Sequence, residues 1–471
     1  MGELDYLKLW GKADRYDDGK IVWHPLAYHM LDVAAVAEEV LNREPESTKM
    51  LYAEDYGLPW EEAKGWILFF VALHDIGKAT PAFQYKIPDI FKDLNKIGLT
   101  ISNRTLEKWK EKSPISHGEL SVSLLTDYLK TFGYEFEMAK FISEAVGIHH
   151  GHRTSPTVLR NIKPDEKGNE TWSSIRNKLI DSLLSNWNLK KENIQNIESL
   201  SSAGFMRLAG LTAFADWIGS NTEYFQYAKE PEKYFSLNEY LKEAKEKAIK
   251  ALDSLGWHKK SSLLSKPDSL ENIFSYLSKP EPFKPRPLQI KIKEIVDNAH
   301  KPILILIEAP MGEGKTEASL YAHLKLQNNL KHRGMYIALP TQATGNSMFK
   351  RVAKFLEEMK HPIVLDLQLL HGAAFLNDNF LKLKIKAIYS NLKKPNVVAE
   401  EWFTHKKRSL LSDYGVGTVD QALLSVMNTK HQFVRIWGLG NRVIILDEVH
   451  AYDMYTSTLI ESLIEWLFAL G

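Results

Sequence analysis

The spacing of apolar positions along this chain changes near residue 256. Before that point, apolar residues recur every three or four positions, which is typical of helices that bury one face. The clearest stretches are Leu26–Leu41, Trp66–Ala79, Leu120–Phe132, Met138–Ile148 and Phe205–Ile218. Residues 163–196 are mostly polar, so we expect a loop there, followed by an exposed helix over residues 237–255. The pattern predicts an all-α domain over residues 1–255.

Prolines and serines interrupt the pattern over residues 256–282, which predicts a linker. From residue 283 to residue 471, short apolar runs alternate with helical segments. We expect four of these runs to be buried parallel strands: Ile303–Ile307, Met335–Leu339, Ile363–Leu365 and Val443–Leu446. The alternation predicts a second domain of α/β type with a parallel sheet, so the fold class is multidomain.

Length and composition narrow the possible chemistry. A chain of 471 residues is too long for one compact core. It has no cysteine, so any metal must be bound by His, Asp or Glu side chains. Because we find neither a membrane-spanning run nor a signal peptide, we expect a cytoplasmic protein without membrane contact. The net charge of +1 does not by itself indicate a nucleic-acid-binding protein.

A glycine-rich loop follows the first predicted strand of the second domain and precedes a helix. It runs from Ala309 to Thr316, with Ala309 at the position of the motif's first glycine. Gly312 and Gly314 would let backbone N–H groups surround phosphate oxygens. Lys315 would reach the terminal phosphates of ATP, and Thr316 would hold Mg²⁺.

An acidic pair follows the last predicted strand. In Asp447-Glu448-Val449-His450, we expect Asp447 to lie in the Mg²⁺ shell and Glu448 to orient the attacking water. A chance combination of a glycine-rich loop and an acidic turn is the weaker interpretation, because both motifs occur in the right order on the right elements.

Three further segments resemble helicase motifs. Residues 283–286 with Gln289 resemble the Q motif, in which Gln289 would read the adenine edge. Residues 340–344 resemble motif Ia and residues 415–421 resemble motif Ib, both of which contact the phosphates of a DNA strand. A threonine after a strand is usually only a helix cap, so each match alone is weak. Together they predict the first RecA-like lobe of a DExH helicase over residues 283–471.

Histidines and aspartates in the first half form the pattern of an HD phosphohydrolase. His74-Asp75-Ile76-Gly77-Lys78 ends a buried helix, and the two oxygens of Asp75 can bridge two metals. Asp216 lies on an otherwise apolar helix, so it needs a cation partner. The remaining candidate ligands stand at helix ends or on apolar faces: His29, His117, His149 and His150.

Each of these histidines alone could have a purely structural role. His29 could be a hydrogen-bonded core residue, and His149-His150 could be a solvated helix end. Taken together, two carboxylates and five histidines are typical of a bimetallic hydrolase site. We expect His24, His152 and His258 to be surface residues.

An HD domain followed by a DExH motor resembles the CRISPR-associated nuclease–helicase family of type I interference systems. The resemblance covers essentially the whole chain, but only the N-terminal portion of the family's length, so we expect the second RecA-like lobe to be absent and ATP hydrolysis to be incomplete. It implies that His29, His74, Asp75 and Asp216 bind one metal, and that Asp75, His117, His149 and His150 bind the second.

The same resemblance implies an antiviral role. Lys78 would steady the scissile phosphate beside Asp75, and the substrate would be single-stranded DNA in an R-loop opened by an RNA-guided surveillance complex. ATP with Mg would drive 3′–5′ translocation. Imidazole-rich ligands favour Mn, Fe, Co, Ni or Zn as the two divalent ions.

Two other functions compete with this interpretation. An HD nucleotidase acting on small nucleotides would have the same metal site, although the motor half would then have no purpose. A recruitment module with a degenerate HD site is the non-enzymatic alternative, and the complete ligand set argues against it.

Overall fold

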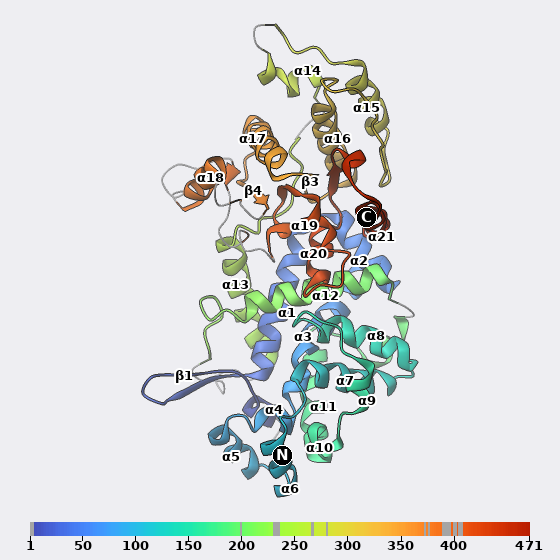
Figure 1. Ribbon diagram of the computed structural model, residues 1–471. Coiled ribbons are helices and arrows are strands. Elements are labelled where there is room, and N and C mark those ends of the chain that lie inside the picture. Colours follow the sequence, from blue (N-terminus) through green and yellow to red (C-terminus); the bar gives the residue numbers. More distant parts are fainter. Residues whose placement is uncertain are drawn as a thin grey trace. The chain divides into compact units, whose positions relative to one another are not determined.

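The computed structural model describes residues 4–471 except 198–199, 229–235, 265–267, 279–280, 372–373, 375–376, 389–396, 399–402 and 404–407. It divides into two compact units (Figure 1). The first contains residues 1–42 and 52–254, and the second contains residues 43–51 and 255–471. A short segment from early in the sequence therefore belongs to the second unit.

The first unit is helical apart from one hairpin, in which β1 (Trp10–Arg15) pairs antiparallel with β2 (Ile21–Pro25). Helices α7 (His117–Lys130) and α8 (Phe136–Gly147) lie side by side (Figure 1). The other helices are η1 (Asp5–Lys8), α1 (Leu26–Arg43), α2 (Glu46–Tyr56), α3 (Trp60–Ala72), η2 (Leu73–Lys78), α4 (Pro81–Gln84), α5 (Pro88–Lys96), α6 (Asn103–Glu111), α9 (Pro156–Arg160), α10 (Pro164–Lys167), α11 (Glu170–Ser185), η3 (Lys191–Asn196), α12 (Ser202–Gly219) and α13 (Leu237–Ser254). The predicted helical first domain is confirmed.

The loop predicted over residues 163–196 is wrong, because this segment contains α11. Trp172, Ile175, Leu179 and Leu183 are buried on one side of that helix. Their spacing of three or four residues is helical, but polar residues between them hid the pattern.

The second unit contains a parallel sheet of five strands, in the order β5-β4-β6-β3-β7. The strands are β3 (Met335–Leu339), β4 (Leu365–Leu370), β5 (Val397–Val398), β6 (Tyr414–Thr418) and β7 (Val443–Leu446). Its helices are α14 (Leu270–Ile273), η5 (Ser275–Leu277), α15 (Pro287–Asp297), α16 (Lys315–Leu330), α17 (Gln342–Glu358), α18 (Asp378–Ile388), η8 (Ser409–Leu411), α19 (Val419–Leu423), α20 (Gln432–Leu439), η9 (Val449–Ala451) and α21 (Met454–Ala469). The predicted α/β class is therefore confirmed.

Individual strands differ from the prediction. Residues 303–307 form no strand: Leu304 and Leu306 are 76% and 82% exposed, whereas Ile305 and Ile307 pack against the core. β4 begins at Leu365, where the run predicted at Ile363–Leu365 ends. β6 was not predicted as a strand, because its glycines have low strand propensity. Within the predicted linker, Trp257 and Phe274 are buried in the second unit.

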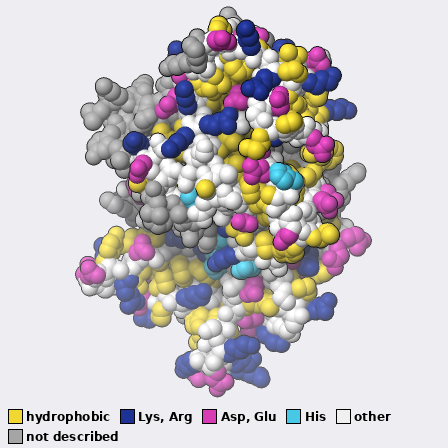
Figure 2. Space-filling model, turned by 45° about the horizontal axis from the view of Figure 1, so that its top comes forward, with side chains coloured by type: hydrophobic (Ala, Val, Ile, Leu, Met, Phe, Trp, Pro, Cys, Tyr) yellow, Lys and Arg dark blue, Asp and Glu magenta, His cyan; other side chains and the backbone are white. Residues whose placement is uncertain are grey.

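The surface is mixed in charge. On the face shown in Figure 2, lysine and arginine side chains are interspersed with aspartate and glutamate, which agrees with the net charge of +1. Among the helices that the structure describes, none is both long and apolar enough to cross a membrane.

Candidate metal centre and nucleotide-binding loop

The candidate metal centre is built around Asp75, in the short helix η2 that follows α3. Residues 65–72 of α3 are all buried, so the chain enters η2 inside the core. Asp75 itself has a non-helical backbone (φ −107°, ψ 17°), which marks a kink in η2. The buried helix therefore delivers His74 and Asp75 to the interior of the unit.

The two carboxylate oxygens of Asp75 face two different groups of histidines. Oδ2 lies 3.1 Å from Nε2 of His29 and 3.3 Å from Nε2 of His74. Oδ1 lies 3.4 Å from Nε2 of His117 and 3.6 Å from Nε2 of His149. In each group, counting His150 with the second, the possible ligand atoms lie within 4.8 Å of one another. Asp75 is the member that both groups share.

Asp216 and His150 complete the two groups. Oδ1 of Asp216 lies 3.6 Å from Nε2 of His29 and 3.7 Å from Nε2 of His74. On the other side, Nε2 of His150 lies 2.7 Å from Nε2 of His117. All seven residues that we predicted as ligands therefore converge on one place, although the sequence spreads them from residue 29 to residue 216.

The donor atoms fit divalent metal ions. Oδ1 of Asp75 and Nε2 of His74 are buried and have no hydrogen-bond partner within the described residues. The Nδ1–H groups of His74 and His149 donate to the carbonyls of Val71 (2.9 Å) and Val146 (3.0 Å), which directs both Nε2 atoms toward Asp75. Nitrogen and carboxylate donors without sulfur suit Mn, Fe, Co, Ni or Zn.

Burial and neighbouring charges shift the pKa values of this cluster. Burial lowers the pKa of His117 to about 3 and that of His149 to about 4, so both rings are neutral and able to bind a metal. Burial also acts to lower the pKa of His74, but Asp75 and Asp216 outweigh it and raise the value to about 9. Burial would raise the pKa of Asp75, yet Lys78 and His74 hold it well below its usual range.

Lys78 is buried beside the carboxylates. Its Nζ lies 2.6 Å from Oδ2 of Asp75 and donates to the carbonyl of Gly11 at 3.0 Å. The side-chain amide of Gln84, also buried, donates to the carbonyls of Trp10 and Lys78. The hairpin and η2 are thus connected by polar contacts next to the metal centre.

Two residues of this site were missed in the sequence. Ser220 donates from its hydroxyl to Oδ1 of Asp216 at 2.6 Å, and Lys12 donates to the oxygen of Ser220 at 2.7 Å. Ser220 stands four positions after Asp216, a helical spacing that could have revealed it. Lys12 reaches the site from β1, and no sequence signal connects it with Asp216.

Our prediction that His24 is a surface residue is wrong, whereas His152 is exposed as predicted and His258 is half-buried. His24 is only 2% exposed and its Nε2 lies 2.9 Å from Oδ2 of Asp32. The end of β2 turns this histidine inward, where a buried carboxylate is available to it. His24 stands between Trp23 and Pro25 in an apolar stretch, and nothing in that stretch identifies Asp32 as its partner.

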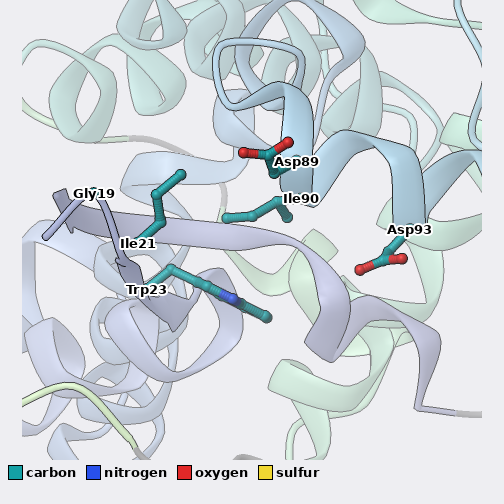
Figure 3. A pocket seen from close by; sticks show the side chains of 6 residues that line it. All are labelled: Gly19, Ile21, Trp23, Asp89, Ile90 and Asp93. Carbon is teal, nitrogen blue, oxygen red and sulfur yellow. The ribbon is translucent and has the colours of Figure 1, made fainter.

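The hollow shown in Figure 3 is separate from the ligand set. Ile21 and Trp23 of β2 line one side, and Asp89, Ile90 and Asp93 of α5 line the other, around a volume of about 300 Å³. It is wide open and carries no metal-ligating histidine.

In the second unit, the predicted phosphate-binding loop leads into α16. Gly312 (φ +85°) and Gly314 (φ +77°) have the left-handed backbone that favours glycine. Nζ of Lys315 donates to the carbonyl of Ala309 at 2.7 Å, so this side chain folds back over its own loop. Gln289 is buried against the same loop, and its amide nitrogen donates to the carbonyl of Gly314 at 3.3 Å. Thr316 is the second residue of α16.

The other predicted motif residues lie at the carboxyl ends of strands. Asp447 directly follows β7, and Glu448 has a left-handed backbone (φ +54°), which is uncommon for a residue other than glycine. Thr341 follows β3 and caps α17 by accepting from the N–H of Thr344. The carboxyl edge of a parallel sheet is where ligands bind in α/β folds.

Comparison with known proteins identifies relatives of the whole chain. The family model described as "Cas3, HD domain" matches residues 10–225. The CRISPR-associated endonuclease/helicase Cas3 of Thermus thermophilus is 40% identical over 99% of this chain and 48% of its own length. The Cas3 endonuclease/helicase of Escherichia coli K12 is 30% identical over 97% of this chain and 52% of its own length.

Solved structures lead to the same relatives. The crystal structure of T. fusca Cas3-ADP superposes with a TM-score of 0.78 at 26% identity, over 98% of this chain and 49% of that one. A second crystal structure, of a CRISPR-associated protein, gives a TM-score of 0.79 at 33% identity and covers 99% of this chain and 51% of that one. The chain spans about half the length of the relatives it matches.

Proposed function

Because the chain belongs to the Cas3 nuclease/helicase family, over the roughly half of that family's length that it spans, we propose that its first unit is a metal-dependent DNA nuclease. One observation carries the proposal. Asp75 is buried, and its two oxygens face two separate groups of histidines, as a carboxylate that bridges two metals requires.

His29, His74, Asp75 and Asp216 would hold one divalent ion, and Asp75, His117, His149 and His150 would hold the other. The bound ions would activate a water molecule and neutralise the charge that develops on the scissile phosphate. Lys78 would add a positive charge on the Asp75 side of that phosphate, and burial of the centre would strengthen its interaction with the phosphate oxygens.

We propose single-stranded DNA as the substrate. Five of the seven ligand residues are fully buried or nearly so, and a stacked duplex could not bring its backbone to such a recessed centre. The family of the chain supports a role in CRISPR interference, in which an RNA-guided surveillance complex would open an R-loop and supply the displaced strand.

We also propose that the second unit binds ATP with Mg and belongs to a 3′–5′ DNA translocation motor. Gly312, Gly314, Lys315 and Thr316 would hold the phosphates and the magnesium ion. Asp447 would complete the magnesium shell, and Glu448 would orient the attacking water. Gln289 would bind the adenine base, and its side chain also donates to the carbonyl of Gly314 in the phosphate-binding loop. Binding of the base would therefore affect the loop that holds the phosphates.

The proposed nuclease can be tested with circular single-stranded DNA and Mn²⁺, Ni²⁺, Co²⁺ or Mg²⁺, with and without ATP. We expect cutting without ATP, and we expect Asp75→Ala to reduce the rate at least about 100-fold, because it removes the residue common to both ligand groups. Asp93→Ala is the matched control, since Asp93 is exposed and pairs only with Lys96 among the contacts described.

If Asp75→Ala cut the DNA at the unchanged rate, the assignment of the metal centre would be wrong. Lys315→Ala should leave ATP-independent cutting intact while removing ATP binding. If free deoxynucleotides are hydrolysed and suppress cutting of the DNA circle at equal concentration, the alternative of a small-nucleotide hydrolase is correct instead.

A further inference from the structure

The buried histidines of the metal centre are not all held in the same way. His74 and His149 each donate Nδ1–H to a backbone carbonyl three residues earlier. Nε2 of His29 faces Asp75 in the same manner, but its buried Nδ1 has no hydrogen-bond partner among the described residues. Ligating histidines usually have that second hydrogen bond, and it fixes the ring. Apart from the contacts of Nε2 with the carboxylates, the direction of the His29 ring therefore depends on helix α1.

Tyr240 of α13 holds α1 on both sides of His29. Its ring stacks on Tyr28, with 3.8 Å between ring centroids and 6° between the planes. Its hydroxyl donates to Oδ1 of Asp32 at 2.9 Å. Residues 28 and 32 flank His29 in the first two turns of α1, so one tyrosine restrains the backbone before and after the ligand.

His24 secures the other oxygen of Asp32. The backbone N–H of Ala228 donates to Nδ1 of His24 at 3.0 Å, which places the imidazole proton on Nε2. That Nε2–H then donates to Oδ2 of Asp32 at 2.9 Å. Both oxygens of the fully buried carboxylate thus accept a hydrogen bond, as a buried carboxylate requires. We call His24, Tyr28, Asp32 and Tyr240 the α1 brace.

We propose that Asp32 and Tyr240 are positioning residues of the metal centre, which fix the first turns of α1 and thereby direct Nε2 of His29 toward the metal. The inference rests on the proposed function, in which His29 is a ligand. The carboxylates that contact His29 are Asp75 and Asp216, whereas Asp32 contacts His24 and Tyr240. Asp32 therefore acts on His29 through the hydrogen bonds that hold helix α1. A cluster that served only folding would not need to flank a ligand whose own ring lacks support.

The test measures Mn²⁺ affinity of the whole chain by calorimetry. Asp32→Ala removes both hydrogen bonds, and we expect it to weaken Mn²⁺ binding roughly tenfold or more. Asp32→Asn should restore affinity to within about threefold, because the amide can accept from His24 and donate to the Tyr240 hydroxyl. Tyr240→Phe keeps the ring stacked on Tyr28 but removes the hydrogen bond to Asp32. We expect its Mn²⁺ affinity to be about twofold to tenfold lower.

Glu38→Ala is the matched control. Glu38 lies on the same helix and pairs with Lys64 and Lys245, so its loss removes a carboxylate from α1 without touching the brace. We expect unchanged Mn²⁺ affinity from this variant. If Glu38→Ala weakened Mn²⁺ binding as much as Asp32→Ala does, a general weakening of α1 would explain both variants. That result would overturn the inference.

A double-mutant cycle with His29→Ala separates action through His29 from action on the centre as a whole. We expect Asp32→Ala to cause no further loss once His29 is gone. A full additional loss, an Asp32→Asn variant as weak as Asp32→Ala, or unchanged affinity in all brace variants would each overturn the inference. Failure of the unchanged chain to bind Mn²⁺ would overturn the proposed function as well.

Discussion

Gly77 illustrates how closely the elements approach one another at the metal centre. A Cβ at this position would lie 2.0 Å from the carbonyl oxygen of His117 and 2.6 Å from the backbone nitrogen of Ser121. The N–H of Gly77 donates to the hydroxyl of Ser121 at 2.8 Å. The glycine in His74-Asp75-Ile76-Gly77-Lys78 is therefore required by the approach of η2 to the first turn of α7, which places His117 beside Asp75.

We expect Gly77→Ala to push η2 away from α7, because the new methyl group would meet backbone atoms that cannot move independently. Overpacking of this kind should lower the free energy of unfolding by about 1–3 kcal/mol and weaken Mn²⁺ binding at least about tenfold. Thermal unfolding and calorimetry measure the two effects. Gly345→Ala is the control, since the nearest atom to its Cβ would be 4.0 Å away. Unchanged Mn²⁺ affinity in Gly77→Ala would contradict the argument.

Single site residues could be predicted from the sequence where a polar residue type stood on an otherwise apolar helix. Asp216 was recognisable because an unpaired aspartate on a buried helix is costly. Lys12 and His24 could not be identified in this way. Each depends on a partner distant in the sequence, Ser220 for Lys12 and Ala228 for the tautomer of His24.

At the scale of elements, α16 carries a buried group that the proposed ATP chemistry does not use. His323 is fully buried, and neither ring nitrogen has a hydrogen-bond partner in the part of the chain that the structure describes. Burial and the charge of His332 lower the pKa of His323 to about 3, and burial lowers the pKa of His332 to about 4. Both residues belong to the second unit and must be neutral in it.

The second unit should therefore lose stability in acid. Between pH 6.5, where histidine in the unfolded chain titrates, and about pH 4, the unfolded chain binds protons that the folded chain does not. The free energy of unfolding should fall by about 1.4 kcal/mol per pH unit for each histidine over that window. His323→Leu removes one of the two groups, so the difference in stability between pH 7 and pH 5 should shrink. Thermal unfolding at both values measures it, and an equal difference in variant and parent would refute the account.

Besides α11, the sequence misjudged two segments whose structure depends on neighbouring strands. Residues 303–307 have the composition of a buried strand, but composition cannot say whether a neighbour pairs with them. β6 was missed for the opposite reason. Gly415 and Gly417 reduce strand propensity, yet Cβ atoms there would lie 2.8 Å from the ring of Tyr336 and 2.6 Å from the carbonyl oxygen of Leu370. Tight packing in the sheet requires glycine at both positions.

At the scale of the whole molecule, residues 43–51 belong to the second unit, although they comprise the end of α1 and the start of α2, and the rest of both helices belongs to the first. Glu44 forms an ion pair with Arg333 at 2.9 Å, and both side chains are 2% exposed. Asn441 donates to the hydroxyl of Thr48, and the guanidinium of Arg43 donates to the carbonyl of Trp257. Arg333 and Asn441 lie just before β3 and β7, so their contacts lie at the amino ends of the two strands.

We expect Glu44→Gln to lower the free energy of unfolding of the second unit by about 3–5 kcal/mol, because Arg333 would remain buried without a counter-charge. Denaturation by urea, followed through hydrogen exchange of the β3 and β6 amides, measures the change. Glu46→Gln serves as control: Glu46 is exposed and pairs only with Lys49 among the described contacts, so its loss should cost less than about 1 kcal/mol. If both substitutions lowered the free energy of unfolding by the same amount, the buried pair would contribute no more to stability than the exposed one.

The placement of residues 43–51 also governs the order in which a ribosome can complete the two units. Thr48 and its partner Asn441 are 393 positions apart. At about 5–20 residues per second, roughly 20–80 s pass between the synthesis of the two. During that interval the first unit can fold around Asp75. Residues 43–51 cannot yet make their contacts with the second unit, because Asn441 has not been synthesised. The first unit can therefore fold before the second, but the second unit cannot be completed without residues 43–51, which are synthesised before the rest of it.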